Sequence, residues 1–449
     1  MHKMRRMISL LLIVFMLTTV TGCGKNAVSD AKDVKTAEDD AIKIREPKDE
    51  EKKENKDNKD KSEKHSFSAS NELTGASSDS ESDGKKKDDA FMQAYRDYAF
   101  RLFQENYRQH PQTGMISPFS LYMALGMLGN AAGGDTKTEL EQLLGLPMDE
   151  NNRYAKAWMN QLEKDGAFSG ANAIWIQNSF SKNVERDFLK RCADYYKASV
   201  IATDFLDPMA VGDVNQWVND KTNGMIHKLY DEIDPMTVSI LMNAIAFEAK
   251  WQEAFREENI HDGEFTHENG SVTIESMMCG TAESGFFENE YCTGCAKDYM
   301  GGNFAFLALR PKDGVAISTL VDWLSEENFA ALMQSAKHGN VRLELPSFEE
   351  EYSVSMVPML KNMGVNRAFL FGTADFTAFS KMERLCVSDV LQKTFISVDA
   401  KGTRAAAVTG ITIVNVSLMN EYSVTFDRSF VYMIVDKDGN LPVFMGIYQ

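Results

Sequence analysis

The segment from residue 399 to residue 419 places the strongest constraint on how this chain can fold. Its first half is made of small residues, including Ala405–Ala407, and its second half, including Ile411–Val416, is apolar, β-prone and uncharged. As a fixed core strand the alanine run would pack poorly, and as a permanently exposed loop the second half would be an aggregation hazard. Both objections ease if the segment is exposed first and later becomes a buried strand.

The order of the predicted elements favours an α+β domain between about residue 89 and residue 449. Apolar residues recur at helical spacing over 91–103, after Ser117 and over 210–233, and Thr136 and Glu139 form a capping box before another short helix. The β-rich runs come later, at 239–247, 304–309, 341–345, 394–398 and 422–426, and in a C-terminal hairpin of 430–435 and 441–448. Helices early and strands late, without βαβ alternation, predict mostly antiparallel sheets.

The N-terminal residues predict export and a lipid anchor. A basic start precedes the apolar run Ile8–Val20, which as a helix reaches only ~20 Å, short of the ~30 Å of a bilayer core. The following Val20–Cys23 resembles a bacterial lipobox. That resemblance implies a signal segment of residues 1–23 that includes the lipobox cysteine, cleavage before Cys23, and a lipid anchor on Cys23 on the outer face of a bacterial membrane. The alternative is an ordinary signal peptide with an incidental cysteine.

Residues 24–88 are expected to form a disordered, charged tether. They are dominated by Lys, Asp, Glu, Ser and Asn, and 48–64 is nearly all charge, so the stretch cannot bury enough apolar surface to fold. As a coil it spans roughly 45 Å. The alternative is a charged arm that binds a partner. The chain's net charge of −18 repels phosphate, so no nucleic-acid partner is expected.

Residue patterns typical of enzymes are missing from the sequence. It contains no GxSxG elbow, HExxH helix, P-loop or GxGxxG turn after a strand. The histidines of the domain are His110, His227, His261, His267 and His338, and none has metal-site spacing. Cys292 and Cys295 form a CxxC, which we interpret as an incidental or structural pair. We therefore expect no enzyme activity, no metal and no cofactor.

The segment Gly402–Gly410, GTRAAAVTG, resembles the reactive-loop hinge of the serpins, a family of protease inhibitors. Other serpin-like motifs follow one another along the domain: Met115–Ser120, Leu241–Phe247 with Lys250 and Trp251, Leu343–Phe348, Ala374–Thr377 and Phe444–Gly446. Together they cover residues 89–449. The resemblance implies the serpin fold, with early helices, three mostly antiparallel sheets and an exposed reactive-centre loop at about 400–421.

The resemblance also implies a mechanism. The target protease cleaves the loop, the loop inserts into the central sheet, and the protease remains trapped as a covalent acyl complex with a monomeric inhibitor. An inserted strand alternates its faces, so Thr403, Ala405, Ala407 and Thr409 would face the core. The residues Arg404, Ala406 and Val408 would face outward, and Gly402 would form the turn. The small, uncharged core-facing set suits insertion, because no charge is buried.

The scissile bond has two candidates. Counting forward from the hinge places it at Val416–Ser417, and counting back from the C-terminal strands places it at Leu418–Met419. A small aliphatic residue before the bond suits elastase-like or subtilisin-like serine proteases, whereas Leu418 suits chymotrypsin-like ones. Papain-like cysteine proteases are a further target class that the sequence allows. The alternative function is a non-inhibitory binding or scaffold protein at the cell surface.

By the same resemblance, five residues form the regions that control opening of the central sheet. Ser117, Ser120, Asn243 and Gln392 would make the shutter, and Trp251 the breach, where insertion begins. Gln392 stands where the family usually has a histidine. A glutamine side chain both donates and accepts hydrogen bonds, so the network is expected to survive with an altered pH response.

Overall fold

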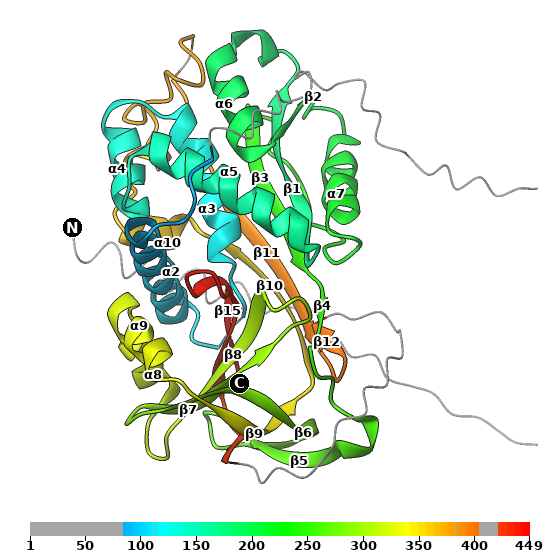
Figure 1. Cartoon of the computed structure of the whole chain (residues 1–449). Helices are drawn as coiled ribbons and strands as arrows, with labels where there is room; N and C mark the ends of the chain where they lie inside the picture. The colour runs from blue at the N-terminus through cyan, green and yellow to red at the C-terminus, as the bar shows by residue number, and fades with distance from the viewer. Residues whose placement is uncertain (1–83, 113, 383, 404–420) are drawn as a thin grey trace, which may run out of the picture. The chain divides into compact units, whose positions relative to one another are not determined.

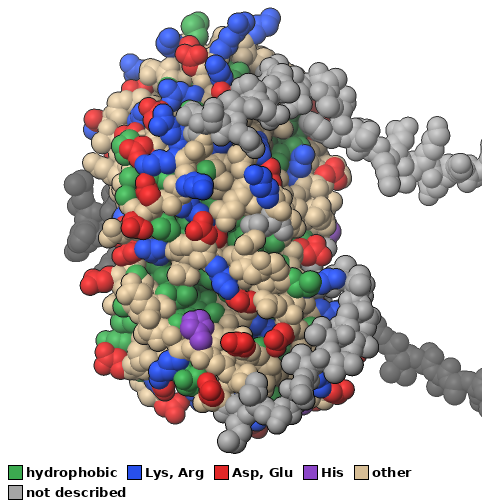
Figure 2. All heavy atoms as spheres, in the orientation of Figure 1, with side chains coloured by type: hydrophobic (Ala, Val, Ile, Leu, Met, Phe, Trp, Pro, Cys, Tyr) green, Lys and Arg blue, Asp and Glu red, His purple; other side chains and the backbone are tan. Residues whose placement is uncertain are grey.

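The structure is a computed structural model, and it describes residues 84–112, 114–382, 384–403 and 421–449. Cys23, the signal peptide and tether residues 24–83 lie outside the described residues. Within the described ranges, no helix is long and apolar enough to cross a membrane. Acidic and basic side chains are interspersed on the face that Figure 2 shows, so the negative net charge does not form one patch there.

Helices dominate the first third of the described chain, as predicted. They are α2 (Asp89–Gln109), α3 (Pro118–Ala131), α4 (Gly134–Leu144), α5 (Met148–Asp165), α6 (Arg186–Tyr196) and α7 (Ala210–Lys221), with the shorter α8 (Ile317–Trp323), α9 (Glu326–Gln334) and α10 (Val357–Asn362) later. The predicted spacing of apolar residues in α2 produces an aromatic core. There Phe91 stacks on Tyr154 at 4.3 Å, and Tyr95 meets Trp158 edge-on at 4.8 Å.

The central sheet consists of two parts. In one, β1 (Phe168–Gln177) lies between β2 (Ser199–Thr203) and β3 (Ser239–Phe247). In the other, the order is β10 (Phe348–Ser355), β11 (Leu391–Val398), β12 (Gly402–Thr403) and β4 (Ala249–Lys250). β3 and β11 lie side by side in Figure 1. Among the described residues, β3 pairs only with β1, and β11 only with β10 and β12. In the described part of the chain no strand pairing joins the two parts, and they are connected by the chain itself, which runs from β3 through Glu248 into β4.

The remaining strands form one strongly curved sheet. Its order is β13 (Tyr422–Thr425), β9 (Lys337–Pro346), β6 (Val272–Glu288), β7 (Cys292–Asp298), β8 (Phe304–Pro311), β14 (Phe430–Asp436) and β15 (Leu441–Tyr448), with β5 (Ile260–Thr266) paired to β6. Only β13–β9 and β1–β2 are parallel among the described pairs. The predicted α+β class with mostly antiparallel sheets is confirmed.

Two predictions about helices were wrong. The helical pattern over 210–233 is helix only to Lys221, because the Thr222 hydroxyl takes over the hydrogen bonds of the next turn and Asn223 has a positive φ of 50°. The capping box does not form, since α4 already begins at Gly134. The Thr136 hydroxyl instead accepts a hydrogen bond from the Asp375 N–H, at 2.9 Å.

The packed domain includes residues just before α2. The Lys87 side chain is 3% exposed, and its Nζ lies 2.7 Å from the carboxylate of the fully buried Asp436. Trp158 Nε1 donates to the same carboxylate at 2.8 Å. The last residues of the predicted tether thus contact the domain and do not belong to a free coil.

The CxxC segment lies within β7. Residues three apart in a strand point to opposite faces, so Cys292 and Cys295 cannot reach each other, and both are free thiols. Burial raises the pKa of each thiol to about 12. The pair is therefore incidental.

Candidate functional site: the hinge and the gap in the central sheet

The start of the hinge is already part of the central sheet. Thr403 pairs with Val398 of β11 on one side and with Ala249 of β4 on the other, and Gly402 pairs with Lys250. Thr403 is 1% exposed, and its hydroxyl lies 2.5 Å from that of Tyr299. A Cβ at Gly402 would lie 2.2 Å from the Ala249 carbonyl oxygen, so only glycine fits there.

A short turn fixes the direction in which the hinge enters the sheet. The Asp399 carboxylate accepts hydrogen bonds from the backbone N–H groups of Lys401, at 2.7 Å, and Gly402, at 3.0 Å. The Asp399 N–H donates to the Gly402 carbonyl at 2.9 Å. This side chain therefore folds the chain back on β11, as Asp and Asn commonly do in turns.

Trp251 holds the same turn from the opposite side. Its indole Nε1 donates to the Asp399 carbonyl at 2.8 Å, and its backbone N–H donates to the Lys401 carbonyl at 2.9 Å. The indole ring stacks on Tyr299 with centroids 4.6 Å apart and planes 11° apart. The structure thus places the predicted breach tryptophan in contact with the turn that starts the hinge.

Lys297 is a breach residue that the sequence did not reveal. It is 6% exposed, and its Nζ donates to the Glu253 carbonyl at 2.7 Å and lies 4.5 Å from the Phe255 ring centroid. Burial lowers the pKa of Lys297 to about 8. The Phe255 N–H in turn donates to the Ala400 carbonyl, so the lysine supports the hinge turn from below. No sequence signal distinguished this lysine from a surface one.

The four predicted shutter residues lie in one hydrogen-bond network. The Gln392 side-chain amide accepts from the Ser117 N–H and donates to the Ser117 carbonyl, each at 2.9 Å. The Ser117 hydroxyl accepts from the Ser120 N–H at 3.1 Å, and the Ser120 hydroxyl donates to the Asn243 carbonyl at 3.3 Å. The network links the N-terminus of α3 to β11 on one side of the gap and to β3 on the other.

Asn172 extends this network and was missed. The Asn243 Nδ2 donates to the Asn172 Oδ1 at 2.9 Å, and the Asn172 Nδ2 donates to the Tyr196 carbonyl at 2.6 Å. Asparagine is rare in a buried strand, and that rarity was the only signal available. The Asn243 Oδ1 is buried and accepts no hydrogen bond in the described part of the chain.

The remaining predicted site residues lie outside the described residues. They are the hinge residues Arg404, Ala405, Ala406, Ala407, Val408 and Thr409 and the candidate scissile-bond residues Val416, Ser417, Leu418 and Met419.

Comparisons with known proteins agree with this geometry. The family model described as serpin (serine protease inhibitor) matches residues 93–449. An uncharacterised serpin-like protein of Thermococcus kodakarensis is 30% identical over 79% of this chain and 84% of its own length. Leukocyte elastase inhibitor A of Mus musculus is 28% identical over 78% of this chain and 96% of its own length.

Solved structures of a thermophilic serpin, tengpin, are also similar. The native state matches with a TM-score of 0.75 and 33% identity, covering 81% of this chain and 95% of tengpin. The latent state matches with a TM-score of 0.71, covering 81% and 98%. A relative of this similarity therefore exists in two states. The family is one of protease inhibitors and not of enzymes. With a matching family model over residues 93–449 and the predicted serpin fold confirmed, this chain belongs to the serpin family.

Proposed function

We propose that this protein inhibits proteases as a suicide substrate, whose cleaved loop inserts into the central sheet and traps the protease covalently. The observation that carries the proposal is the partly filled gap between β3 and β11. Gly402 and Thr403 already pair on both sides at one end of the gap, and the shutter network spans it further along. Insertion then requires that the residues after Thr403 extend the same strand pairing between β3 and β11.

The pairing of Thr403 fixes the register of the strand that would follow. We expect these neighbours in the inserted state: Ala405 with Phe247 and Ile396, Ala407 with Ile245 and Thr394, and Thr409 with Asn243 and Gln392. The inserted Thr409 hydroxyl would then lie at the level of the Asn243 Oδ1, which has no donor in the described structure. Insertion would satisfy that buried acceptor, which removes a penalty of about 1–3 kcal/mol.

The same register accounts for Arg404, where the family usually has an acidic residue. Arg404 would lie on the outer face opposite Glu248 and Ser397. Both neighbours are only half-buried, and one carries a carboxylate. The arginine therefore gains a partner of opposite charge and does not oppose insertion.

We infer that the scissile bond is Val416–Ser417, with Leu418–Met419 as the second candidate. The hinge-to-bond length fixes how far the protease is carried, which favours counting from Gly402. Valine before the bond suits shallow apolar pockets, so elastase-like and subtilisin-like enzymes are the proposed targets. The relative named leukocyte elastase inhibitor A supports the elastase-like class.

We further propose that the protein is exported and anchored through a lipid on Cys23, as a monomer on the outer face of a bacterial membrane. The lipobox-like motif and the charged tether support this proposal. The first described residues lie beside α5, where the Lys85 N–H donates to the Arg153 carbonyl at 3.1 Å, whereas β12 lies in the other half of the domain in Figure 1. The tether therefore joins the domain at a place separate from the start of the hinge.

The test is covalent trapping by the full chain. We would incubate it with elastase, subtilisin, chymotrypsin, trypsin and papain and examine the products by SDS gels and intact-mass spectrometry. A covalent adduct, with a released C-terminal peptide that begins at Ser417, is the expected result, and a peptide that begins at Met419 would move the bond. Cleavage without adduct and without a gain in thermal stability would contradict inhibition and favour a non-inhibitory binding function.

A further inference from the structure

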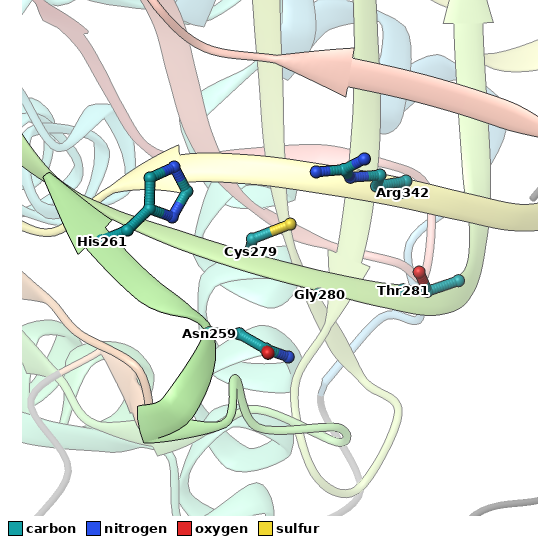
Figure 3. Close-up of a pocket in the computed structure, with 6 residues that line it drawn as sticks. All are labelled: Asn259, His261, Cys279, Gly280, Thr281 and Arg342. Atoms are coloured by element: carbon teal, nitrogen blue, oxygen red, sulfur yellow. The ribbon is translucent and has the colours of Figure 1, made fainter. Parts of the chain in front are cut away.

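A polar pocket lies on the curved sheet, beside the site described above. It has a volume of about 320 Å³ and is lined by Asn259, His261, Cys279, Gly280, Thr281 and Arg342. Figure 3 shows the Cys279 sulfur between the His261 ring and the Arg342 guanidinium. The pocket thus combines a nucleophilic side chain with a cationic one, and the protease-trapping mechanism uses neither.

Strand register explains why these side chains share one face. Cys279 of β6 lies opposite Glu344 of β9, and Thr281 lies opposite Arg342. Directly opposed residues of an antiparallel pair project to the same side. Gly280 faces the other way, where a Cβ would lie 3.0 Å from Phe255. The face of β6 toward which Gly280 points is tightly packed against Phe255, so the pocket residues lie on the opposite face of the strand.

The Arg342 guanidinium is available to a ligand because the neighbouring Glu344 carboxylate is bound to other residues. The Arg342 guanidinium lines the pocket together with Cys279 and is exposed to solvent. The neighbouring Glu344 carboxylate is already paired with His261 Nε2 at 2.9 Å and accepts from the Thr425 hydroxyl at 3.3 Å. Cys279 therefore shares the pocket with a solvent-exposed cation that can hold an anionic reagent beside the sulfur.

The other described cysteines are in different settings. Cys192, Cys292 and Cys295 are buried, and burial raises the pKa of each thiol. Cys386 is exposed and lies outside this pocket. Cys279 alone among the described cysteines combines partial exposure with a pocket that an arginine also lines. The buried thiols and Cys386 provide internal controls for any reaction at Cys279.

We propose that this pocket is a thiol-modification site, where Cys279 exchanges with a small disulfide that carries a carboxylate held by Arg342. The Cys279 thiol loses its proton to water, and the thiolate attacks one sulfur of the disulfide. A bond forms between Cys279 and that sulfur, the original S–S bond breaks, and the other half leaves as a thiolate. The pocket has room for the attached half, and the arginine selects anionic reagents over cationic ones.

The test uses the full chain with two probes, oxidised glutathione, which is anionic, and cystamine, which is cationic. Peptide mapping by mass spectrometry follows the modification of Cys279 and Cys386 over time. We expect oxidised glutathione to modify Cys279 faster than Cys386, and cystamine to lose this preference. Arg342→Gln should slow glutathionylation of Cys279 by about two- to fivefold, the effect of one exposed ion pair, and leave the cystamine rate unchanged.

Control variants separate chemistry from folding. Arg342→Lys keeps the cation and should retain most of the preference for oxidised glutathione, and Cys279→Ser should remove the adduct. The buried Cys192, Cys292 and Cys295 must stay unmodified in every variant, which shows that the fold is intact, and reaction at the exposed Cys386 must stay constant, which shows that the reagent is equally active. Equal rates at Cys279 and Cys386, or equal slowing of both probes by Arg342→Gln, would overturn the proposal. None of these readouts depends on protease inhibition.

Discussion

Moving one charge by one residue in the hinge gives a sharp test of loop insertion. The variant that combines Arg404→Ala with Ala405→Arg has the composition and net charge of the natural chain. Only the predicted face of the arginine changes, from the outer face to the core. We expect this variant to lose covalent trapping and to become an ordinary substrate that the protease cleaves and releases.

The neighbours of position 405 set the size of the effect. In the register fixed by Thr403, an inserted residue 405 lies between Phe247, which is 4% exposed, and Ile396, which is 2% exposed. A charge there has no partner, and the effective penalty for burying one ion is several kcal/mol. If ~3 kcal/mol of that penalty falls on the insertion barrier, insertion slows by about 100-fold. Hydrolysis of the acyl complex then precedes trapping.

The assay compares the adduct fraction and the moles of inhibitor consumed per mole of protease inactivated. Arg404→Ala alone is the matched control, and it should trap like the natural chain because it places no charge in the core. The thermal midpoint of each intact protein, measured at one scan rate, shows whether folding is affected. Trapping by the exchange variant at the natural efficiency would refute the predicted register and facing of the hinge.

Three further predictions concern stability, each measured by thermal unfolding at a fixed scan rate. Burial raises the pKa of Glu350 from 4.5 to about 7, so its ionisation destabilises the fold as pH rises from about 4.5 to 7. Glu350→Gln should therefore match the natural chain at pH 4 and exceed it by at most about 3 kcal/mol above pH 7; a constant difference would exclude this cause. Lys87→Met leaves the buried Asp436 carboxylate without its cation and should destabilise the fold by about 3–5 kcal/mol, and a loss below 1 kcal/mol would contradict the pairing. Gln392→His removes one of the two hydrogen bonds to Ser117, which should lower the free energy of unfolding by about 1–3 kcal/mol. Because a buried imidazole resists protonation, the stability of this variant should fall further below about pH 6.5. A variant with no added pH dependence would argue against burial of the imidazole.

Local patterns determined much of the fold. The helical spacing of apolar residues predicted α2 and α3, and alternation with a turn at 438–440 predicted the β14–β15 hairpin. These patterns act over a few residues, so one stretch of sequence contains all the information that they need. The same locality explains why the helical pattern over 210–233 extends past the real helix, which hydrogen bonds of the Thr222 side chain and a positive φ at Asn223 end.

The sequence alone determined that the hinge is small and uncharged on its core-facing side, because side-chain size and strand alternation are local properties. Tertiary structure decided what the hinge meets. Lys297 became a breach residue, Asn172 joined the shutter, and Lys87 reached Asp436 across 349 positions, since these partners come together only when distant strands and helices pack. Burial and register depend on the whole chain at once, and for that physical reason no local pattern encodes them.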